Sequence, residues 1–299
     1  MRIAVVGSGI SGLSAALLLS RKHEVVLFEG NDYLGGHTDT HRVEVDGRML
    51  EVDTGFIVHN PQHYPLLTRL FEELGVATQA TTMGFSVQDA GSGLEYNATS
   101  LDALFCQRRN LASPRFLGML RDLVRFYRNA PELLAGDGPG PALGDYLQAK
   151  GYGDAFRDQH LVPMASALWS SPAVDILRFP ARYLVQFMAN HHMLQLAGRP
   201  EWRVVRGGSR RYVEAMTARW DVQVRLRSPV RAIARDADGA TVRCDAGSER
   251  FDQVVLACHS DQALALLEDA SYLERDILGA ITYQHNDTVL HTDARLLPR

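Results

Sequence analysis

A glycine-rich segment near the N-terminus, Gly7–Gly12 with the sequence Gly-Ser-Gly-Ile-Ser-Gly, constrains the fold of this chain more than any other feature. It follows the apolar, β-branched run Arg2–Val6, which is typical of a buried parallel strand, and it precedes helix-forming residues 13–20. A second buried strand is predicted at Glu24–Phe28, with Glu29 at its end. This order predicts a βαβ unit in which the glycine turn joins the first strand to the helix.

Each residue type in this unit has a physical role in holding a dinucleotide. Gly7 permits the tight turn, Gly9 leaves room for a diphosphate beside the backbone, and Gly12 lets the helix pack closely on the strand. The helix N-terminus offers free N–H groups and a partial positive charge to phosphates. Glu29 can accept hydrogen bonds from both ribose hydroxyls and would repel a 2′-phosphate. The unit therefore predicts a dinucleotide site, with a purely structural turn as the alternative.

The residues after Glu29 argue against an ordinary NAD-binding domain. An NAD-binding domain continues into another helix, whereas this chain reaches a second glycine pair at Gly35-Gly36. Such a turn lets a loop fold back over the diphosphate. Two alternating runs, Thr40–Val45 and Arg48–Asp53, then predict a β-hairpin around Asp46-Gly47, and a further glycine follows within Asp53–Phe56.

At these motifs the sequence resembles the flavin-containing amine oxidase superfamily, which includes protoporphyrinogen oxidases and phytoene desaturases. The resemblance rests on the glycine turn, on Glu29, on Leu34–His37 (LGGH) and on Val52–Phe56 (VDTGF). It is strongest with a bacterial subgroup known only as FAD (NAD)-binding oxidoreductases of undefined substrate, in which His replaces the usual Arg after the glycine pair. The resemblance implies a flavoprotein oxidoreductase with FAD as its cofactor.

The resemblance continues through the C-terminal third of the chain. Trp202–Val205 is similar to the strand that reopens the family's cofactor domain, and 228–233 to the segment that reads the adenine, a contact that Val230 would make. Residues 252–258 are similar to the strand that returns to the parallel sheet. Without the family, the pattern of 222–258 predicts an antiparallel meander followed by a buried strand.

The expected fold class is therefore α/β. A Rossmann-like FAD-binding domain, with a parallel sheet plus an antiparallel meander, is interrupted by a mostly helical substrate domain. We expect its first part at 1–58, the helical insert at 59–200 and its second part at 201–299. A Rossmann fold with an unrelated β-insert is the alternative.

The sequence departs from the family pattern in two respects. Tyr33 and His37 stand where the family usually has Arg, and a neutral imidazole cannot make the bidentate phosphate contacts of a guanidinium. The family's late Gly-Asp motif, which holds the ribityl chain and the flavin, is not found in this sequence. We therefore expect a C-terminally truncated member that lacks this flavin-binding segment.

Together, the motifs and the resemblance give a set of candidate cofactor-binding residues. They are Gly7, Ser8, Gly9, Ile10, Ser11, Gly12, Glu29, Gly30, Gly35, Gly36, His37, Thr38, Thr54, Gly55, Phe56, Val230 and Ala257. No cluster of acid, base and nucleophile identifies itself, so the sequence leaves the catalytic residues unknown. By position alone, Phe56–His59 and His191-His192 are candidates to line a substrate pocket.

The middle of the chain is predicted to be mostly helical between Leu101 and Asn190. A helix is expected to start at Asn60-Pro61, with Asn as the N-cap, and to end at Gly75. His59 and His63 have the i, i+4 spacing of some metal sites, but His59 precedes the cap. Ordinary histidines are therefore the preferred interpretation, and no metal is expected.

The segment Arg115–Leu134 predicts an amphipathic helix. Its expected apolar face carries Phe116, Leu120, Leu123, Val124 and Tyr127, with arginines on the other face. Packing within its own domain is the preferred interpretation, and contact with a membrane surface or an acyl chain is the alternative.

Composition sets broad limits on function. The chain has 299 residues, 46% of them hydrophobic, and a net charge of −4, which indicates a folded protein without the basic face that nucleic-acid binding requires. Three cysteines without metal-binding spacing indicate free thiols in a reducing compartment. Glycines interrupt the apolar N-terminus, so neither a signal peptide nor a membrane span is predicted. We expect a cytoplasmic protein.

The expected function is FAD-dependent removal of hydride from a C–N or C–C bond of a small substrate, apolar or lipid-like. Many amine oxidases similar to this family place a lysine near the flavin, but residues 281–291 contain none, which favours desaturase-like or lipid-modifying chemistry. The alternatives are an NAD-dependent dehydrogenase and a non-catalytic or degenerate dinucleotide-binding protein.

Overall fold

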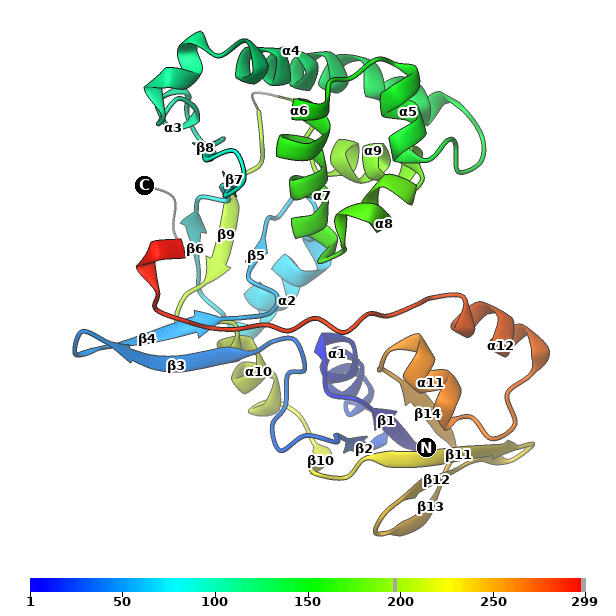
Figure 1. Cartoon of the computed structure of the whole chain (residues 1–299). Coiled ribbons are helices and arrows are strands. Elements are labelled where there is room, and N and C mark those ends of the chain that lie inside the picture. Colours follow the sequence, from blue (N-terminus) through cyan, green and yellow to red (C-terminus); the bar gives the residue numbers. More distant parts are fainter. Residues whose placement is uncertain (196–197, 297–299) are drawn as a thin grey trace. The chain divides into compact units, whose positions relative to one another are not determined.

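The computed structural model describes residues 1–195 and 198–296 and divides the chain into two compact units (Figure 1). The first unit comprises Met1–Thr81 and Arg203–Asp287, and the second comprises Thr82–Trp202 and Thr288–Arg299. The division assigns residues 59–81, which we expected in the helical insert, to the first unit.

A four-stranded parallel sheet forms the centre of the first unit, in the order β10-β2-β1-β14. Its strands are β1 (Arg2–Val6), β2 (Glu24–Phe28), β10 (Val222–Arg225) and β14 (Gln253–Leu256). All three pairings are parallel, with Val5 opposite both Leu27 and Val255. The predicted bounds of the first two strands are confirmed, and so is the α/β class.

Helices cover one face of this sheet (Figure 1). They are α1 (Ile10–Leu19), α2 (Pro65–Leu74) and α10 (Arg210–Thr217). Side chains alternate along a strand, so Val5 and Leu27 point to this face. They pack in one buried cluster with Leu13, Phe71 and Met216.

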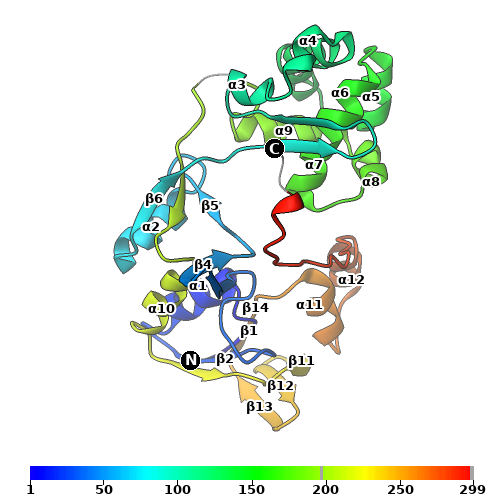
Figure 2. The same cartoon turned by 60° about the vertical axis from the view of Figure 1, so that its left-hand side comes forward.

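An antiparallel meander covers the other face (Figure 2). It consists of β11 (Val230–Asp236), β12 (Gly239–Cys244) and β13 (Gly247–Phe251). Phe28 of the parallel sheet meets Phe251 of the meander edge to face, with ring centroids 5.9 Å apart. The predicted combination of a parallel sheet with a meander is therefore confirmed.

Smaller elements complete the first unit. The predicted hairpin forms from β3 (Thr40–Val45) and β4 (Arg48–Asp53), and positive φ angles at Asp46 (50°) and Gly47 (73°) make its turn. A three-stranded sheet has the order β5-β9-β6, with β5 at Val58–His59, β9 at Trp202–Val205 and β6 at Thr78–Thr81. Two helices follow β14, namely α11 (Ser260–Leu266) and α12 (Tyr272–Gly279).

Helix α2 corrects one prediction. It begins at Pro65 rather than at Pro61, with Tyr64 as the N-cap. Asn60 instead forms a local turn, because its side-chain oxygen accepts a hydrogen bond from the backbone N–H of His63 at 2.9 Å. The helix ends at Gly75 as predicted, where φ is 70°.

The second unit combines a hairpin with helices around its own core. The hairpin is β7 (Ser86–Asp89) with β8 (Leu94–Asn97). The α-helices are α3 (Leu101–Leu104), α4 (Pro114–Asn129), α5 (Leu143–Ala149), α6 (Asp154–Phe156), α7 (Val162–Trp169), α8 (Ala173–Arg178) and α9 (Ala181–Asn190). A π-helical turn at Arg157–Leu161 joins α6 to α7, and 3₁₀ turns occur at Arg108–Ala112, Ala130–Ala135 and Ala294–Leu296.

The amphipathic helix differs from its prediction in length and at one position of its apolar face, while Phe116, Leu120, Leu123 and Tyr127 pack on the core as predicted. Helix α4 ends at Asn129, because Pro131 lacks the N–H that another helical turn would need. Its buried face includes Met119 and Phe126, whereas Val124, which we placed on that face, is 42% exposed. Among the described residues, no helix has the length and apolarity that crossing a bilayer requires.

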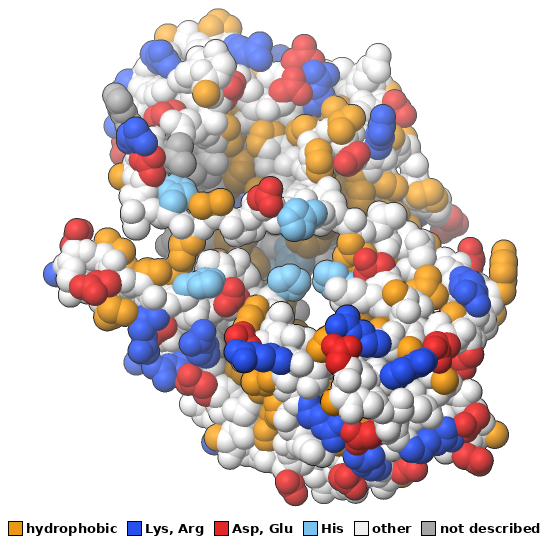
Figure 3. Space-filling view, turned by 60° about the horizontal axis from the view of Figure 1, so that its bottom comes forward, with side chains coloured by type: hydrophobic (Ala, Val, Ile, Leu, Met, Phe, Trp, Pro, Cys, Tyr) orange, Lys and Arg blue, Asp and Glu red, His pale blue; other side chains and the backbone are white. Residues whose placement is uncertain are grey.

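Acidic and basic side chains are interspersed on the face of the molecule shown in Figure 3. The meander illustrates the pairing: the guanidinium of Arg231 lies 2.9 Å from the carboxylate of Asp245, and Arg250 pairs with Asp236. Such interspersed charges form no extended positive surface on this face.

Candidate cofactor site

The turn between β1 and α1 leaves no room for side chains at two of its glycines. Gly7 has a φ of 99°, and a Cβ atom there would lie 2.6 Å from the carbonyl oxygen of Ala257. A Cβ atom on Gly12 would lie 1.9 Å from the carbonyl oxygen of Gly7. These distances explain why strand and helix can approach only with glycine at both positions.

Gly9 differs from these two glycines because its Cα faces open space. It is the N-cap of α1, and no atom lies within 4 Å of the place where its Cβ would be. The first turn of α1 has no acidic residue and no side-chain cap, so no side chain satisfies its N–H groups there. An anion beside Gly9 would therefore meet free donors and the positive end of the helix dipole.

Glu29 is buried at the end of β2, with 9% of its surface exposed. One carboxylate oxygen accepts hydrogen bonds from the backbone N–H and the hydroxyl of Ser8, at 2.9 and 2.6 Å. The other accepts a hydrogen bond from the backbone N–H of Asn31 at 2.8 Å. Glu29 thus fixes the glycine turn, and its oxygens keep acceptor positions for a further donor such as a ribose hydroxyl.

The second glycine pair lies against the first turn. The backbone N–H of Gly35 donates to the carbonyl oxygen of Ser8 at 3.0 Å, and a Cβ atom on Gly36 would lie 3.0 Å from the Cα of Gly9. Gly55 supports the same loop, because its missing Cβ would lie 1.8 Å from the carbonyl oxygen of His37. The three glycine segments therefore lie against one another at the end of the parallel sheet.

Two cavities meet at this site. The Glu29 cavity has a volume of about 680 Å³ and lies between the glycine turn and Val230. The Phe56 cavity has a volume of about 570 Å³ and is also lined by Tyr64 and Tyr212. The walls of both include Gly9, His37, Ala257, Cys258 and His259, which together form the neck between them. Two joined cavities of this size suit a two-part ligand such as a dinucleotide.

Most of the residues named from the sequence lie on these walls. They are Gly7, Ser8, Gly9, Ile10, Ser11, Glu29, Gly30, Gly35, Gly36, His37, Thr38, Phe56, Val230 and Ala257. Gly12, Thr54 and Gly55 line neither cavity: the two glycines permit close backbone contacts, and the backbone N–H of Thr54 donates to Asp39. His59 is buried beneath the site, and the pair His191-His192 belongs to the second unit.

Sequence reasoning missed Cys258, His259, Tyr64 and Tyr212. The first two directly follow β14, whose carboxyl end lies beside that of β1, so the rule that ligands bind at the carboxyl ends of parallel strands would have found them. Tyr64 and Tyr212 come from α2 and α10, and no local pattern marks them. His259 occupies the N-cap position of α11, and Ser260 is its first helical residue.

Cys258 allows a test of cavity access. Burial raises the pKa of its thiol, whereas Cys106 is exposed. We expect iodoacetamide at pH 7.5 to modify Cys258 roughly tenfold more slowly than Cys106, because the thiolate is the reactive form. Added FAD should further slow the modification of Cys258 and leave the rate at Cys106 unchanged, as measured by mass spectrometry of the peptides. Equal protection of both thiols would contradict this placement.

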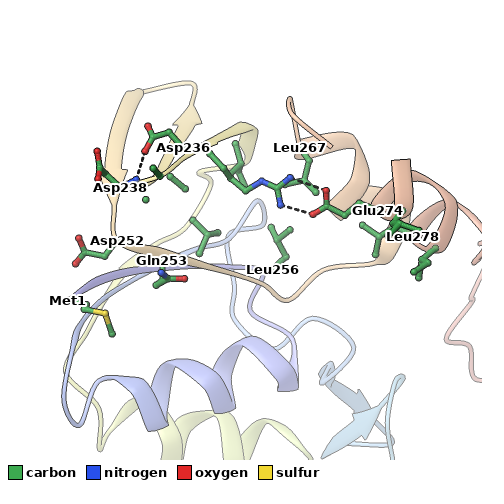
Figure 4. A pocket seen from close by; sticks show the side chains of 17 residues that line it. Met1, Asp236, Asp238, Asp252, Gln253, Leu256, Leu267, Glu274 and Leu278 are labelled. Carbon is green, nitrogen blue, oxygen red and sulfur yellow. Dashed lines mark hydrogen bonds and ion pairs between the residues drawn. The ribbon is translucent and has the colours of Figure 1, made fainter. Parts of the chain in front are cut away.

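A larger cavity, of about 990 Å³, lies away from the glycine turn, between β14, the meander and α12 (Figure 4). Its main charged groups already satisfy one another: the two terminal guanidinium nitrogens of Arg235 lie 2.6 and 3.0 Å from the carboxylate oxygens of Glu274. It lacks glycine-rich turns and free helix N–H groups, so the neck between the other two cavities is the better candidate site. Within the described part of the chain, no three His, Cys, Asp or Glu residues are arranged to hold a metal.

The fold and the site define a Rossmann-like dinucleotide-binding protein with an inserted, mostly helical unit. The sequence pattern of the family described as "Flavin containing amine oxidoreductase" matches residues 10–289, and the chain belongs to this family. Because the family contains flavin, its members use FAD as the cofactor. This assignment argues against the NAD-dependent dehydrogenase that the sequence left as an alternative.

Individual proteins and solved structures are also similar to this chain, the structures in fold alone. AofH of Mycobacterium tuberculosis, which carries the name flavin-containing monoamine oxidase, is 28% identical over 266 residues, covering 85% of this chain and 56% of AofH. A putrescine oxidase with bound putrescine shares the fold with a TM-score of 0.69 at 20% identity, covering 93% of this chain and 63% of that one. A CLA-producing fatty acid isomerase from P. acnes has a TM-score of 0.60 at 17% identity, covering 93% of this chain and 63% of that one. The chain thus spans little more than half of its curated relative and under two thirds of these structures.

Proposed function

We propose that this chain binds FAD across the two cavities and forms the cofactor-binding part of an oxidoreductase that removes hydride from a C–N or C–C bond of a small substrate. The observation that carries the proposal is the neck at Gly9, where open space, free helix N–H groups and two flanking cavities coincide. The adenosine half would occupy the Glu29 cavity, and the flavin half would occupy the Phe56 cavity.

The residues of the site have separate roles in this proposal. When bound, FAD supplies the hydride acceptor of the reaction. The N–H groups at the start of α1 bind the diphosphate, and Glu29 accepts hydrogen bonds from the ribose. The rings of Phe56, Tyr64 and Tyr212 orient the flavin and exclude water from it. Burial raises the pKa values of Tyr64 and Tyr212, so both phenols stay neutral near pH 7.

An apolar or lipid-like substrate fits the chemistry of the Phe56 cavity. No Asp, Glu, Lys or Arg is among the described residues on its wall, and Leu67 and Leu256 add apolar surface. The similar structures include an oxidase with putrescine and an isomerase of a fatty acid, so the fold alone permits either class. The absence of lysine from 281–291 supports a substrate other than an amine.

The test of the cofactor is a titration of the purified chain with FAD, followed by flavin absorbance and fluorescence. We expect saturable binding, and we expect Glu29→Gln to weaken it at least about tenfold, because an amide replaces a charged acceptor. Glu44→Gln, at an exposed position on β3, is the matched control and should bind normally. A folded chain that binds no FAD, or a Glu29→Gln variant that binds as well as the parent, would contradict the proposal.

A further inference from the structure

The two cavities lack the cationic side chains that usually accompany a diphosphate. The chain contains 31 Lys and Arg residues, yet none is among the described residues that line either cavity. His37 and His259 are the side chains on these walls that can become positively charged, and both belong to the neck. A dinucleotide that spans the neck would place its two negative charges beside these imidazoles.

Aromatic packing holds the imidazole of His259, and the imidazole of His37 lies parallel to it. Their rings are nearly parallel, at 17°, with centroids 6.0 Å apart. The ring of Tyr283 stacks on His259 with a centroid distance of 4.3 Å, and its hydroxyl oxygen accepts a hydrogen bond from the backbone N–H of Ser260 at 3.1 Å. Within the described part of the chain, no carboxylate forms an ion pair with either histidine, so each can direct its charge to a ligand.

The other titratable groups on or beside these walls are of types that cannot gain a positive charge. They are Glu29, Tyr33, Asp39, Tyr64, Tyr212, Cys258 and Asp261. The oxygens of Glu29 are engaged by Ser8 and Asn31, and burial raises the pKa values of the three tyrosines and of Cys258. Imidazole is the side chain that ordinarily gains charge between pH 8 and 5.

We propose that His37 and His259 together form a titratable clamp on the cofactor diphosphate, so that protonation of the imidazoles controls the affinity for FAD. This inference rests on the proposed function, because it concerns the same neck. His259 is the new member of the site, positioned there by the stack with Tyr283. A charge-assisted hydrogen bond from imidazolium to phosphate is stronger than one from neutral imidazole.

The experiment measures the dissociation constant of FAD by fluorescence quenching between pH 8.0 and 6.0, where the diphosphate itself keeps its charge. We expect binding to tighten about tenfold over this range. Each single variant, His37→Asn or His259→Asn, should reduce the change to about threefold, and the double variant should abolish it. His37→Arg should bind tightly at pH 8.0 with a weaker dependence on pH, because a guanidinium stays charged. His285→Asn, at an exposed position outside the cavities, is the control and should behave as the parent does.

Binding tests with two further ligands distinguish the clamp from the proposed function. ADP-ribose carries the same diphosphate without a flavin, and its calorimetric affinity should show the same pH dependence, lost in the double variant. Riboflavin lacks the diphosphate and should bind independently of pH. FAD binding that is tight but unchanged by pH or by the double variant would overturn the clamp and leave the proposed function standing. Failure of FAD to bind, with pH-dependent binding of ADP-ribose, would overturn the proposed function and support the clamp.

Discussion

Replacing Gly12 with alanine is expected to destabilise the chain by about 3 kcal/mol or more and to abolish FAD binding. The new Cβ would lie 1.9 Å from the carbonyl oxygen of Gly7, which is backbone and cannot rotate away. The clash can be relieved only if α1 moves away from β1, and this movement would displace the N–H groups at Gly9. The measurements are the urea midpoint and flavin fluorescence of the same sample.

Two other glycines provide matched controls for this effect. Gly9→Ala should fold normally, because φ is −64° and the Cβ would meet open space, but it should weaken FAD binding at least about tenfold by filling the space for the diphosphate. Gly118→Ala, in the middle of α4, also meets open space and should bind FAD as the parent does. If Gly12→Ala matched Gly118→Ala in stability, the close contact between strand and helix would be wrong.

Acidification is expected to weaken the second unit through His160. Burial, aided by the positive charge of Arg199, lowers the pKa of this imidazole to about 4, while a Tyr96 hydroxyl lies 2.8 Å from its Nδ1. In the unfolded chain a histidine binds its proton near pH 6.5. Between these values the unfolded state holds the extra proton, so stability is lost as pH falls from 6.5 towards 4. The loss at pH 5, relative to pH 8, is about 2 kcal/mol.

His160→Phe isolates this contribution. The substituted ring would lie among Phe85 and Phe156, and the hydroxyl of Tyr96 would still donate to the carbonyl oxygen of Gln159 at 2.8 Å. Between pH 8 and 5, the free energy of unfolding measured in urea should fall by about 2 kcal/mol less in the variant than in the parent. Hydrogen exchange of residues 154–169 reports on the stability of the second unit alone. An unchanged pH dependence in His160→Phe would show that other groups cause the loss.

The parts of the fold that depend on local pattern were predictable. The bounds of β1, β2, β3, β4 and β9 agree with the sequence because burial and turn chemistry act over a few residues. The predicted start of α2 was wrong because the side chain of Asn60 can stabilise a local turn as well as it can cap a helix. One member of the predicted apolar face of α4, Val124, was placed wrongly, because the packing around Met119 and Phe126, which no single helix encodes, leaves this residue exposed.

The candidate site also contains residues that local pattern predicts and residues that it does not. Its glycines were predictable, because each marks a place where backbone meets backbone. Tyr64 and Tyr212 were not, since no local pattern marks them and their positions depend on how α2 and α10 pack on the sheet. The sequence rule that finds a phosphate turn says nothing about which distant side chains complete its walls.

The parallel sheet has a consequence for how this chain folds during synthesis. β1 and β2 emerge first, but β10 and β14, and the meander that covers the second face of the sheet, follow the segment Thr82–Trp202. At ordinary rates of translation the two early strands wait on the order of ten seconds for their partners. The continuous segment Thr82–Trp202 has no such delay and can form its own core on the ribosome. The apolar faces of β1 and β2 are therefore the part of the nascent chain with the greatest need of a chaperone.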